Sequence, residues 1–177
     1  MIIIIIILST IIVCGILLLI KSNTNMNQIS DLELKSIFFE NNGKIPSKYT
    51  CDGENINPLL EINKIPNNTK SLALIVDDPD APSGDWVHWL MWNIPPQTTI
   101  IESNFVPPGS IQGINDSKEN KYDGPCPPSG THRYFFKLYA LDIILDLNKD
   151  NKKQNLEKSM IGHILGQTEL IGLYSRQ

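Results

Sequence analysis

The feature that most constrains the fold is the repeated interruption of short apolar runs by clusters of Gly, Pro and Asn. Four runs have strand length or slightly more: "LELKSIFF", "SLALIVD", "WVHWLMWNI" and "HRYFFKLYALDI". The clusters between them, such as "NNGKIPS", "IPPQTT", "VPPGS" and "YDGPCPPSG", are typical of turns and long loops. This pattern predicts a mainly β domain, in which the continuous run "SLALIVD" is a strand buried on both faces.

One helix is expected near the end of the chain. In "NKDNKKQNLEKSMIGHILGQ", five apolar residues fall on one helical stripe: Leu156, Met160, Ile161, Ile164 and Leu165. Asn148 or Asp150 is suited to cap the start of this helix, and Gly166 is suited to its end. The segment "TELIGLYSR" that follows is expected to form a closing strand or an extended tail.

The first 21 residues differ from the rest of the chain. "MIIIIIILSTIIVCGILLLI" is apolar up to Lys21, which is about the length of a helix that crosses a bilayer. We therefore expect residues 1–21 to form a separate transmembrane helix and the protein to be a single-pass membrane protein. A cleaved signal segment, and hence a secreted protein, is the alternative. Lipidation at Cys14 is disfavoured by the bulky Val13 before it.

The remainder suits a short linker and one domain. Residues 22–31 are polar and aperiodic, and residues 32–177 are long enough for a single domain with an ordinary core. The net charge of -4 and the absence of a basic stripe argue against nucleic acid as a partner. Cys51 and Cys126 would form a disulfide in an oxidising compartment and remain small thiols in a reducing one.

Two segments of the chain share one design. In "DDPDAPSGDWVHW", residues 77–89, an acidic loop rich in proline leads into a strand that holds His88. In "GPCPPSGTHRY", residues 124–134, a second proline-rich loop leads into a strand that starts with His132. Because proline restricts φ, both loops are expected to hold their shape.

Alternation along these strands predicts which side chains accompany each histidine. His88 is expected to share a face with Trp86, Leu90 and Trp92. His132 is expected to share a face with Tyr134 and Phe136. If the two strands are neighbours, both imidazoles meet at one end of the sheet, where Asp78 or Asp80 can bind a ring nitrogen. Together with a tyrosine hydroxyl and backbone N–H groups of Gly124 or Gly130, they would form a cradle for an anion such as phosphate.

Other interpretations of these residues stay open. The aspartates can act only as turn caps, and a histidine at the start of a strand can be purely structural. A triad of Ser129, His132 and Asp78 is conceivable, but Ser129 lies in a loop rather than on a nucleophile elbow. Cys126 lacks a helix N-terminus that would activate it. Nothing in the spacing specifies a zinc site, so no metal and no cofactor are expected.

The two motifs together resemble the phosphatidylethanolamine-binding protein family, also called the Raf kinase inhibitor-like family, and in particular its bacterial and archaeal branch. The matching segments are "YTCDGENINPLL", "LALIVDDPDAPSGDWVHWLMWNIP", "GPCPPSGTHRYFFKLYALD" and "GHILGQTELIGLYSR". They span the whole presumed domain in the same order. The resemblance implies a large antiparallel sheet packed on a smaller one, a helix near the C-terminus, and a pocket at one end that binds phosphate-like headgroups.

The resemblance also implies roles for particular residues. The implied ligand-binding residues are Asp78, Pro82, Trp86, His88, Gly124, Pro125, His132 and Tyr134. Asp80 and Arg133 match positions that support the loops. The chain departs from the family pattern after Asn115 and Asp116, where "SKENKYDG" replaces the expected aromatic residue and glycine. The shape of that loop therefore does not transfer from the resemblance.

Three functions are compatible with these features. The first is a binding module, not an enzyme, because no activated nucleophile is evident. It would hold a phosphorylated or anionic small ligand, such as a phospholipid headgroup, and modulate a protein partner, while the N-terminal segment contacts the membrane. The second is a hydrolase with His88 or His132 as its general base. The third is an inhibitor of a protease or kinase that acts through its surface.

Overall fold

The computed structural model of the protein describes residues 31–176, which form two β-sheets, one α-helix and one short 3-10 helix, η1 (Ser47–Tyr49). The larger sheet has the strand order β2-β9-β8-β4-β5-β7, and the smaller sheet has the order β1-β3-β6. The strands of the larger sheet are β2 (Gly43–Lys44), β4 (Ser71–Asp78), β5 (Trp86–Ile94), β7 (Ile111–Gln112), β8 (His132–Leu141) and β9 (Ile164–Tyr174). The strands of the smaller sheet are β1 (Glu33–Lys35), β3 (Leu60–Asn63) and β6 (Ile100–Ile101).

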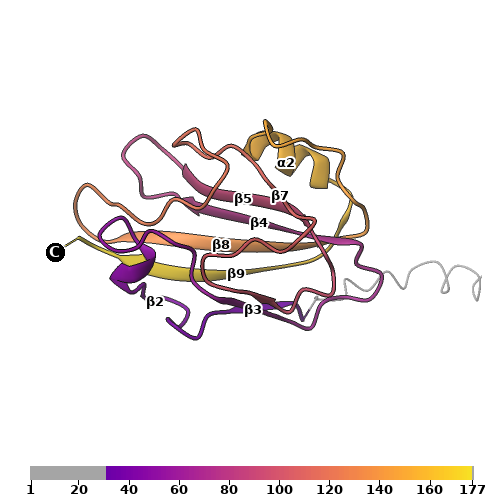
Figure 1. The fold of residues 1–177 in the computed structure, drawn as a ribbon, viewed down its shortest axis with the longest axis horizontal. Coiled ribbons are helices and arrows are strands. Elements are labelled where there is room, and N and C mark those ends of the chain that lie inside the picture. Colours follow the sequence, from indigo (N-terminus) through magenta and orange to yellow (C-terminus); the bar gives the residue numbers. More distant parts are fainter. Residues whose placement is uncertain (1–30, 177) are drawn as a thin grey trace, which may run out of the picture.

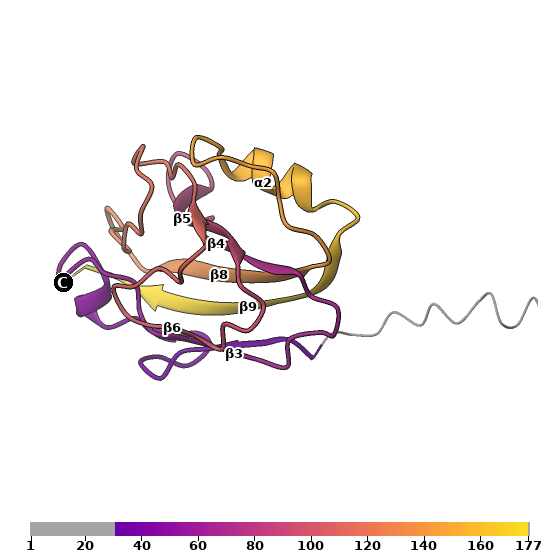
Figure 2. The same cartoon turned by 45° about the vertical axis from the view of Figure 1, so that its right-hand side comes forward.

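The two sheets and the helix form three layers. The smaller sheet covers one face of the larger sheet, and α2 (Lys153–Met160) lies over the other face, near β4 and β5 (Figures 1 and 2). The strand pairs are antiparallel except for β2 with β9, which is parallel. The prediction of a mainly β fold, with a large sheet packed on a smaller one and a helix near the C-terminus, is confirmed.

Strand β4 lies inside the larger sheet, and all of its residues are buried. Leu72, Leu74 and Val76 pack into the core between the two sheets. Ala73 and Ile75 pack into the second core, which includes the buried residues of α2. Because both faces of the strand are covered, its sequence is a continuous apolar run rather than an alternating one, as predicted.

Strand β5 contains a β-bulge at its start. Val76 of β4 pairs with Trp89 of β5, whereas the next residue, Asp77, pairs with Val87. The residue left over between the two pairs is His88. A bulge of this kind bends the strand and redirects a side chain, and it interrupts the simple alternation of the two faces.

The bulge changes the neighbours of His88. Trp89 packs into the core between the sheets, whereas Leu90 and Trp92 pack into the core beneath α2. The ring of His88 contacts the ring of Tyr134, which belongs to the core between the sheets. The prediction that His88 shares a face with Leu90 and Trp92 is therefore wrong, because strict alternation does not hold across a bulge.

Helix α2 is shorter than the predicted stripe. Neither Asn148 nor Asp150 caps it, because Lys152 occupies the N-cap position. At the other end, Gly162 has a φ of 81°, a conformation that suits glycine and turns the chain toward β9. Gly166 therefore lies inside β9 rather than at the end of the helix. The residues of the stripe that the helix itself buries are Leu156 and Met160.

The predicted transmembrane helix requires a correction. Within residues 31–176, no helix is long and apolar enough to cross a membrane. The fold class is that of a mainly β domain with one C-terminal helix, and the single-pass membrane location that depended on a spanning helix is corrected with it. Residues 1–21, to which that helix was assigned, lie outside the described residues, as does nearly all of the predicted linker 22–31.

Candidate functional site

A cavity of about 370 Å³ lies at the end of the larger sheet where β4 ends and β5 and β8 begin. Its walls are the acidic loop, residues 79–85, and the loop before β8, residues 122–131, which we call the wall loop. Seven of the eight predicted ligand-binding residues line it: Asp78, Pro82, Trp86, His88, Gly124, His132 and Tyr134. The eighth, Pro125, does not line the cavity, and its carbonyl oxygen instead accepts a hydrogen bond from the backbone N–H of Cys51.

Sequence reasoning missed six further lining residues: Ala81, Ser83, Asp123, Cys126, Pro127 and Pro128. All of them lie in the two loops that the motifs identified. Alanine, proline and a disulfide cysteine contribute surface rather than chemistry and gave no separate signal, and a single serine or aspartate in a polar loop is too common to give one.

The two histidines meet without being on neighbouring strands. Strand β4 lies between β5 and β8, so the condition under which the two imidazoles were expected to meet, that their strands are neighbours, does not hold. Tyr134 joins the two rings: its ring centroid is 5.2 Å from that of His88, edge to face, and 6.5 Å from that of His132. The bulge turns the ring of His88 toward the side of the sheet on which Tyr134 lies. The ring of His88 on β5 can therefore contact the ring of Tyr134 on β8, although β4 lies between the two strands.

His132 is held by Asp78. The distance from Nδ1 of His132 to Oδ2 of Asp78 is 2.7 Å, and both side chains are buried. The carboxylate accepts this hydrogen bond, so Nδ1 carries a proton. The other oxygen of Asp78 accepts the backbone N–H of Asp80 at 2.8 Å. The predicted contact between an aspartate of the acidic loop and a histidine is confirmed for this pair.

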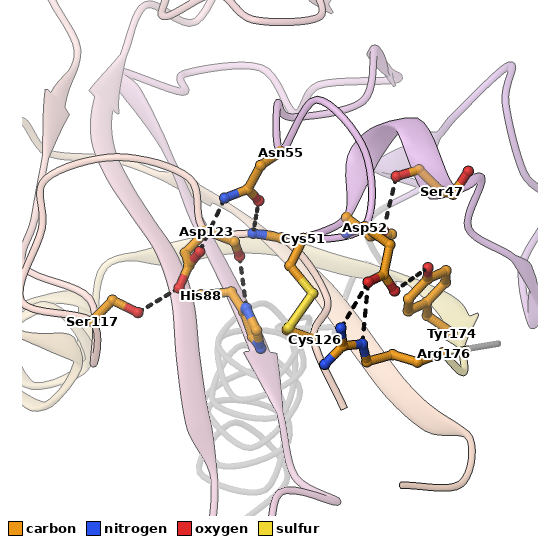
Figure 3. Close-up of a disulfide and its surroundings, with 12 residues drawn as sticks. Ser47, Cys51, Asp52, Asn55, His88, Ser117, Asp123, Cys126, Tyr174 and Arg176 are labelled. Atoms are coloured by element: carbon orange, nitrogen blue, oxygen red, sulfur yellow. Dashed lines mark hydrogen bonds and ion pairs between the residues drawn. A yellow bond between two sulfur atoms is a disulfide. The ribbon is translucent and has the colours of Figure 1, made fainter. Parts of the chain in front are cut away.

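His88 is held by the backbone rather than by an aspartate side chain. Its Nδ1 lies 2.7 Å from the carbonyl oxygen of Asp123 in the wall loop (Figure 3). Since a carbonyl oxygen only accepts, Nδ1 of His88 is the protonated nitrogen. Burial lowers the pKa of His88, and the hydrogen bond to Asp123 opposes this effect less strongly. No side-chain motif could have identified a backbone partner of this kind.

Tyr134 carries an unsatisfied hydroxyl. The residue is buried and lines the cavity, yet its hydroxyl oxygen makes no hydrogen bond of normal geometry among the described residues, although the carboxylate of Asp78 and the backbone of Cys126 lie near it. Burial, together with the nearby carboxylate of Asp78, raises the pKa of this hydroxyl, which is therefore protonated and able to donate. A buried polar atom without a partner is unfavourable unless another group satisfies it.

The wall loop is fastened from outside by the segment that follows η1. A disulfide joins Cys51 to Cys126, which lines the cavity (Figure 3). The backbone N–H of Gly124 donates to Oδ1 of Asn55 at 2.7 Å. A Cβ at Gly124 would lie 2.6 Å from that oxygen, so only glycine fits. The expectation that this N–H is free for a ligand is therefore wrong.

The carboxylate of Asp123 is also fully engaged outside the cavity. Its Oδ1 accepts a hydrogen bond from Asn55 at 3.3 Å, and its Oδ2 accepts one from the hydroxyl of Ser117 (Figure 3). Both oxygens thus have neutral donors, while the backbone carbonyl of the same residue holds His88.

The acidic loop is fastened at its middle by Arg133. The guanidinium binds both carboxylate oxygens of Asp80, at 2.8 Å and 2.7 Å, and the backbone N–H of Arg133 donates to the same side chain. These hydrogen bonds lower the pKa of Asp80 from 3.8 to about 2. The structure thus shows the loop-supporting contact that the resemblance implied for this pair.

The two ends of the acidic loop are joined by Lys153 of α2. Its ammonium group binds Asp77, the residue before the last of β4, at 2.6 Å and also binds Asp85, which precedes β5. Although burial opposes it, these hydrogen bonds raise the pKa of Lys153. This clamp could not be predicted from local pattern, because the lysine is 68 residues from Asp85.

The two residues at which the family pattern ends, Asn115 and Asp116, form a segment that supports the site. Asn115 is buried, and its amide donates to the carbonyl of His88 at 3.2 Å and to that of Lys121 at 3.0 Å. The carboxylate of Asp116 accepts the backbone N–H of Val87 at 2.8 Å. This segment therefore pins the bulged part of β5 that carries His88.

The alternative chemistries gain little from the geometry. Ser129 is exposed and makes no hydrogen bond to His132, and Cys126 is in a disulfide. Within the part of the chain that the structure describes, no group of three or more His, Cys, Asp and Glu residues is placed to hold a metal ion.

The fold and the cavity define a small domain of two packed β-sheets with a pocket at one end of the larger sheet. The family model of the phosphatidylethanolamine-binding proteins matches residues 35–175, and the chain belongs to this family. A UPF0098 protein of Methanothermobacter thermautotrophicus is 55% identical over 150 residues, which cover 82% of this chain and 99% of the relative.

Two solved structures extend the comparison. CT736 of Chlamydia trachomatis, described as a homolog of phosphatidylethanolamine-binding protein, has a TM-score of 0.81 and 37% identity, with 84% of this chain and 99% of that chain covered. YbcL of E. coli, described as a member of the mammalian family, has a TM-score of 0.78 and 26% identity, with 83% and 99% covered. The resemblance to the bacterial and archaeal branch is therefore confirmed.

Proposed function

We propose that this protein is a binding module whose cavity holds a small phosphate-type anion. The observation that carries the proposal is the hydroxyl of Tyr134, which is buried, unpartnered and placed at the cavity between two histidine rings. An anionic oxygen of a ligand would accept the hydrogen bond that this hydroxyl does not make within the protein.

The two carboxylates beside the cavity are already hydrogen-bonded, so their oxygens do not compete with a ligand for the donors of the cavity. Asp78 is occupied by His132 and by the backbone N–H of Asp80, and Asp123 is occupied by Asn55 and by a serine. Donors therefore satisfy the carboxylate oxygens, while the imidazole edges and the tyrosine remain for the ligand. A volume of about 370 Å³ is suited to a headgroup-sized ligand.

Binding rather than catalysis is favoured by the state of the candidate nucleophiles. Cys126 is in a disulfide, and the hydroxyl of Ser83, which lines the cavity, makes no hydrogen bond to either histidine of the site among the described residues. A serine nucleophile needs such a contact to a base. That the pocket also modulates a protein partner stays a prediction.

The proposal is tested by titrating the full chain with inorganic phosphate and with phosphoethanolamine while the histidine ring signals are followed by NMR. We expect the signals of His88 and His132 to shift together and to saturate. His163 is a built-in control, because it pairs with Asp142 and does not line the cavity. Sodium chloride at matched ionic strength controls for screening. Unchanged signals of both site histidines would overturn the proposal.

A further inference from the structure

His88 offers a hydrogen-bond acceptor to a ligand. In His88, Nδ1 carries the proton because it donates to the carbonyl of Asp123. The other ring nitrogen, Nε2, makes no hydrogen bond within the described residues, and the residue lines the cavity. In a neutral imidazole, the nitrogen without a proton is an acceptor. The pocket therefore contains an acceptor, Nε2 of His88, on a ring that contacts the ring of Tyr134, whose hydroxyl is a donor.

Groups from three parts of the fold determine the charge of His88. Asp123 faces it from the wall loop, Asp77 and Asp78 lie on the adjacent strand β4, and Tyr134 contacts it from β8. The three aspartates favour a charged ring, whereas burial disfavours it and is the largest effect, so the pKa of His88 is lowered. The remaining titratable neighbour, His132, is already bound to Asp78. The ring of His88 is thus neutral at neutral pH.

An acceptor beside an anion discriminates between phosphate compounds. The oxygens of a phosphodiester or of a phosphate dianion have no proton, so they would face the lone pair of Nε2 without a hydrogen bond between them. A phosphomonoester monoanion has one P–OH group, which can donate to Nε2 of His88 while a second oxygen accepts the proton of Tyr134. This arrangement satisfies both protein groups at once.

We propose that the cavity binds phosphomonoesters together with one proton, which lies between a phosphate oxygen and Nε2 of His88, and that it thereby selects monoesters over the diesters of lipid headgroups. This inference rests on the proposed function, since it specifies the ligand class of the same cavity. The proton balance is simple. A dianionic ligand, one proton from solvent and a neutral His88 combine to give the complex, and no covalent bond to the protein forms.

The proposal predicts a pH dependence whose sign follows from this balance. The second pKa of a phosphomonoester is about 6. Above that pH, the free ligand is a dianion and His88 is neutral, so the complex holds one more proton than its parts. The association constant should then fall roughly tenfold for each unit by which the pH rises. Below that pH the free ligand already carries the proton, and the affinity should level off.

The test uses isothermal titration calorimetry of the full chain with phosphoethanolamine and glycerophosphoethanolamine. These two compounds share the ammonium group and differ in that one is a monoester and the other a diester. Measurements at pH 6, 7 and 8, each in two buffers of different ionisation enthalpy, count the protons taken up. We expect about one proton per monoester at pH 8. At pH 6, where much of the free monoester already carries its proton, we expect a diester affinity lower by roughly tenfold, as for an unsatisfied buried acceptor.

A matched variant isolates the acceptor. In His88→Gln, the amide can turn a donor toward the ligand, so proton uptake should disappear and the gap between monoester and diester should narrow by about tenfold. If this variant does not fold, the proton count on the natural chain decides by itself. Equal binding of both compounds without proton uptake would overturn the inference while the proposed function stands. Failure of either compound to bind would overturn both.

Discussion

Asp77 and Asp78 are adjacent on β4, both are buried, and they face opposite sides of the sheet. Asp77 lies on the side of α2, where its Oδ2 binds Lys137 at 2.7 Å and Lys153 at 2.6 Å. Asp78 lies on the side of the cavity, where it binds the ring of His132. Two identical side chains, one residue apart, thus belong to a closed ion-pair cluster and to an open pocket.

The difference shows that an unpartnered atom alone does not mark a binding site. Oδ1 of Asp77 and the hydroxyl of Tyr134 are both enclosed without a hydrogen-bond partner in the described part of the chain. Only the tyrosine lines a cavity, whereas Asp77 lines none of the cavities described. On the side of α2, Asp77 is fully buried beside its two lysines, so the unpartnered oxygen is a local cost. On the side of the cavity, the unpartnered hydroxyl of Tyr134 can instead donate a hydrogen bond to a ligand.

The largest expected effect comes from removing the disulfide between Cys51 and Cys126, which fastens the wall loop. The double variant Cys51→Ser/Cys126→Ser opens a covalent loop with a sequence separation of 75 residues. From chain entropy, we expect a loss of about 4 kcal/mol in the free energy of unfolding. Chemical denaturation of the variant and of the reduced natural chain measures it. A loss below about 1 kcal/mol would mean that the hydrogen bonds of Asn55 hold the wall loop without the disulfide.

The second effect compares the two aspartates directly. Asp77→Asn leaves Lys137 and Lys153 facing a neutral amide in a largely buried position. We expect a loss of about 3 kcal/mol, as for breaking a buried ion pair. The control is Asp78→Asn, for which about 1 kcal/mol is expected, because an amide oxygen can still accept the proton of His132. Denaturant unfolding of both variants decides, and equal losses would contradict the distinction between a closed and an open side.

The third effect separates stability from binding on the pocket side. Tyr134→Phe removes a hydroxyl that has no partner in the protein, so the free energy of unfolding should change by less than about 0.5 kcal/mol. The affinity for phosphate should nevertheless fall by roughly threefold to tenfold, since one hydrogen bond to the ligand is lost. Calorimetric titration and thermal unfolding of the same preparation test this. A variant that is clearly less stable would show that the hydroxyl is satisfied within the fold.

The smallest expected effect is the loss of stability at low pH when Asp80, which binds Arg133 and so supports the acidic loop, takes up a proton. The pKa of Asp80 is lowered from 3.8 to about 2 by Arg133, so the stability from this pair is fully present above about pH 4. It should be lost as the pH falls from about 4 to about 2, when the carboxylate takes up a proton. Thermal unfolding of the natural chain and of Asp80→Asn across this range isolates the contribution. Parallel pH curves for the two chains would contradict it.

The features of the fold and of the site that could be predicted from the sequence depend on local apolar patterns and on proline-rich loops. The fully buried strand β4 followed from its apolar run, and seven of the thirteen residues that line the cavity followed from the family resemblance of the two motifs. The convergence of the two loop–strand units was predicted only on the condition that their strands are neighbours, which they are not. The bulge at His88 could not be predicted, because a single extra residue changes the pairing without changing the composition. The carbonyl of Asp123 and the amide of Asn115 were missed because their roles depend on backbone partners distant in the chain.

The clamp formed by Lys153 has a consequence for the order in which the protein is made. A ribosome adds about 5 to 20 residues per second, so the acidic loop leaves it roughly 3 to 14 seconds before the lysine that joins its ends. Strand β9, which flanks β8 along its whole length, is synthesised later still. A nascent chain halted before α2 would already contain every residue that lines the cavity. The two ends of its acidic loop, Asp77 and Asp85, would not yet be joined by Lys153. All residues that line the pocket are thus synthesised before the last fifth of the chain, which supplies the lysine that clamps the acidic loop.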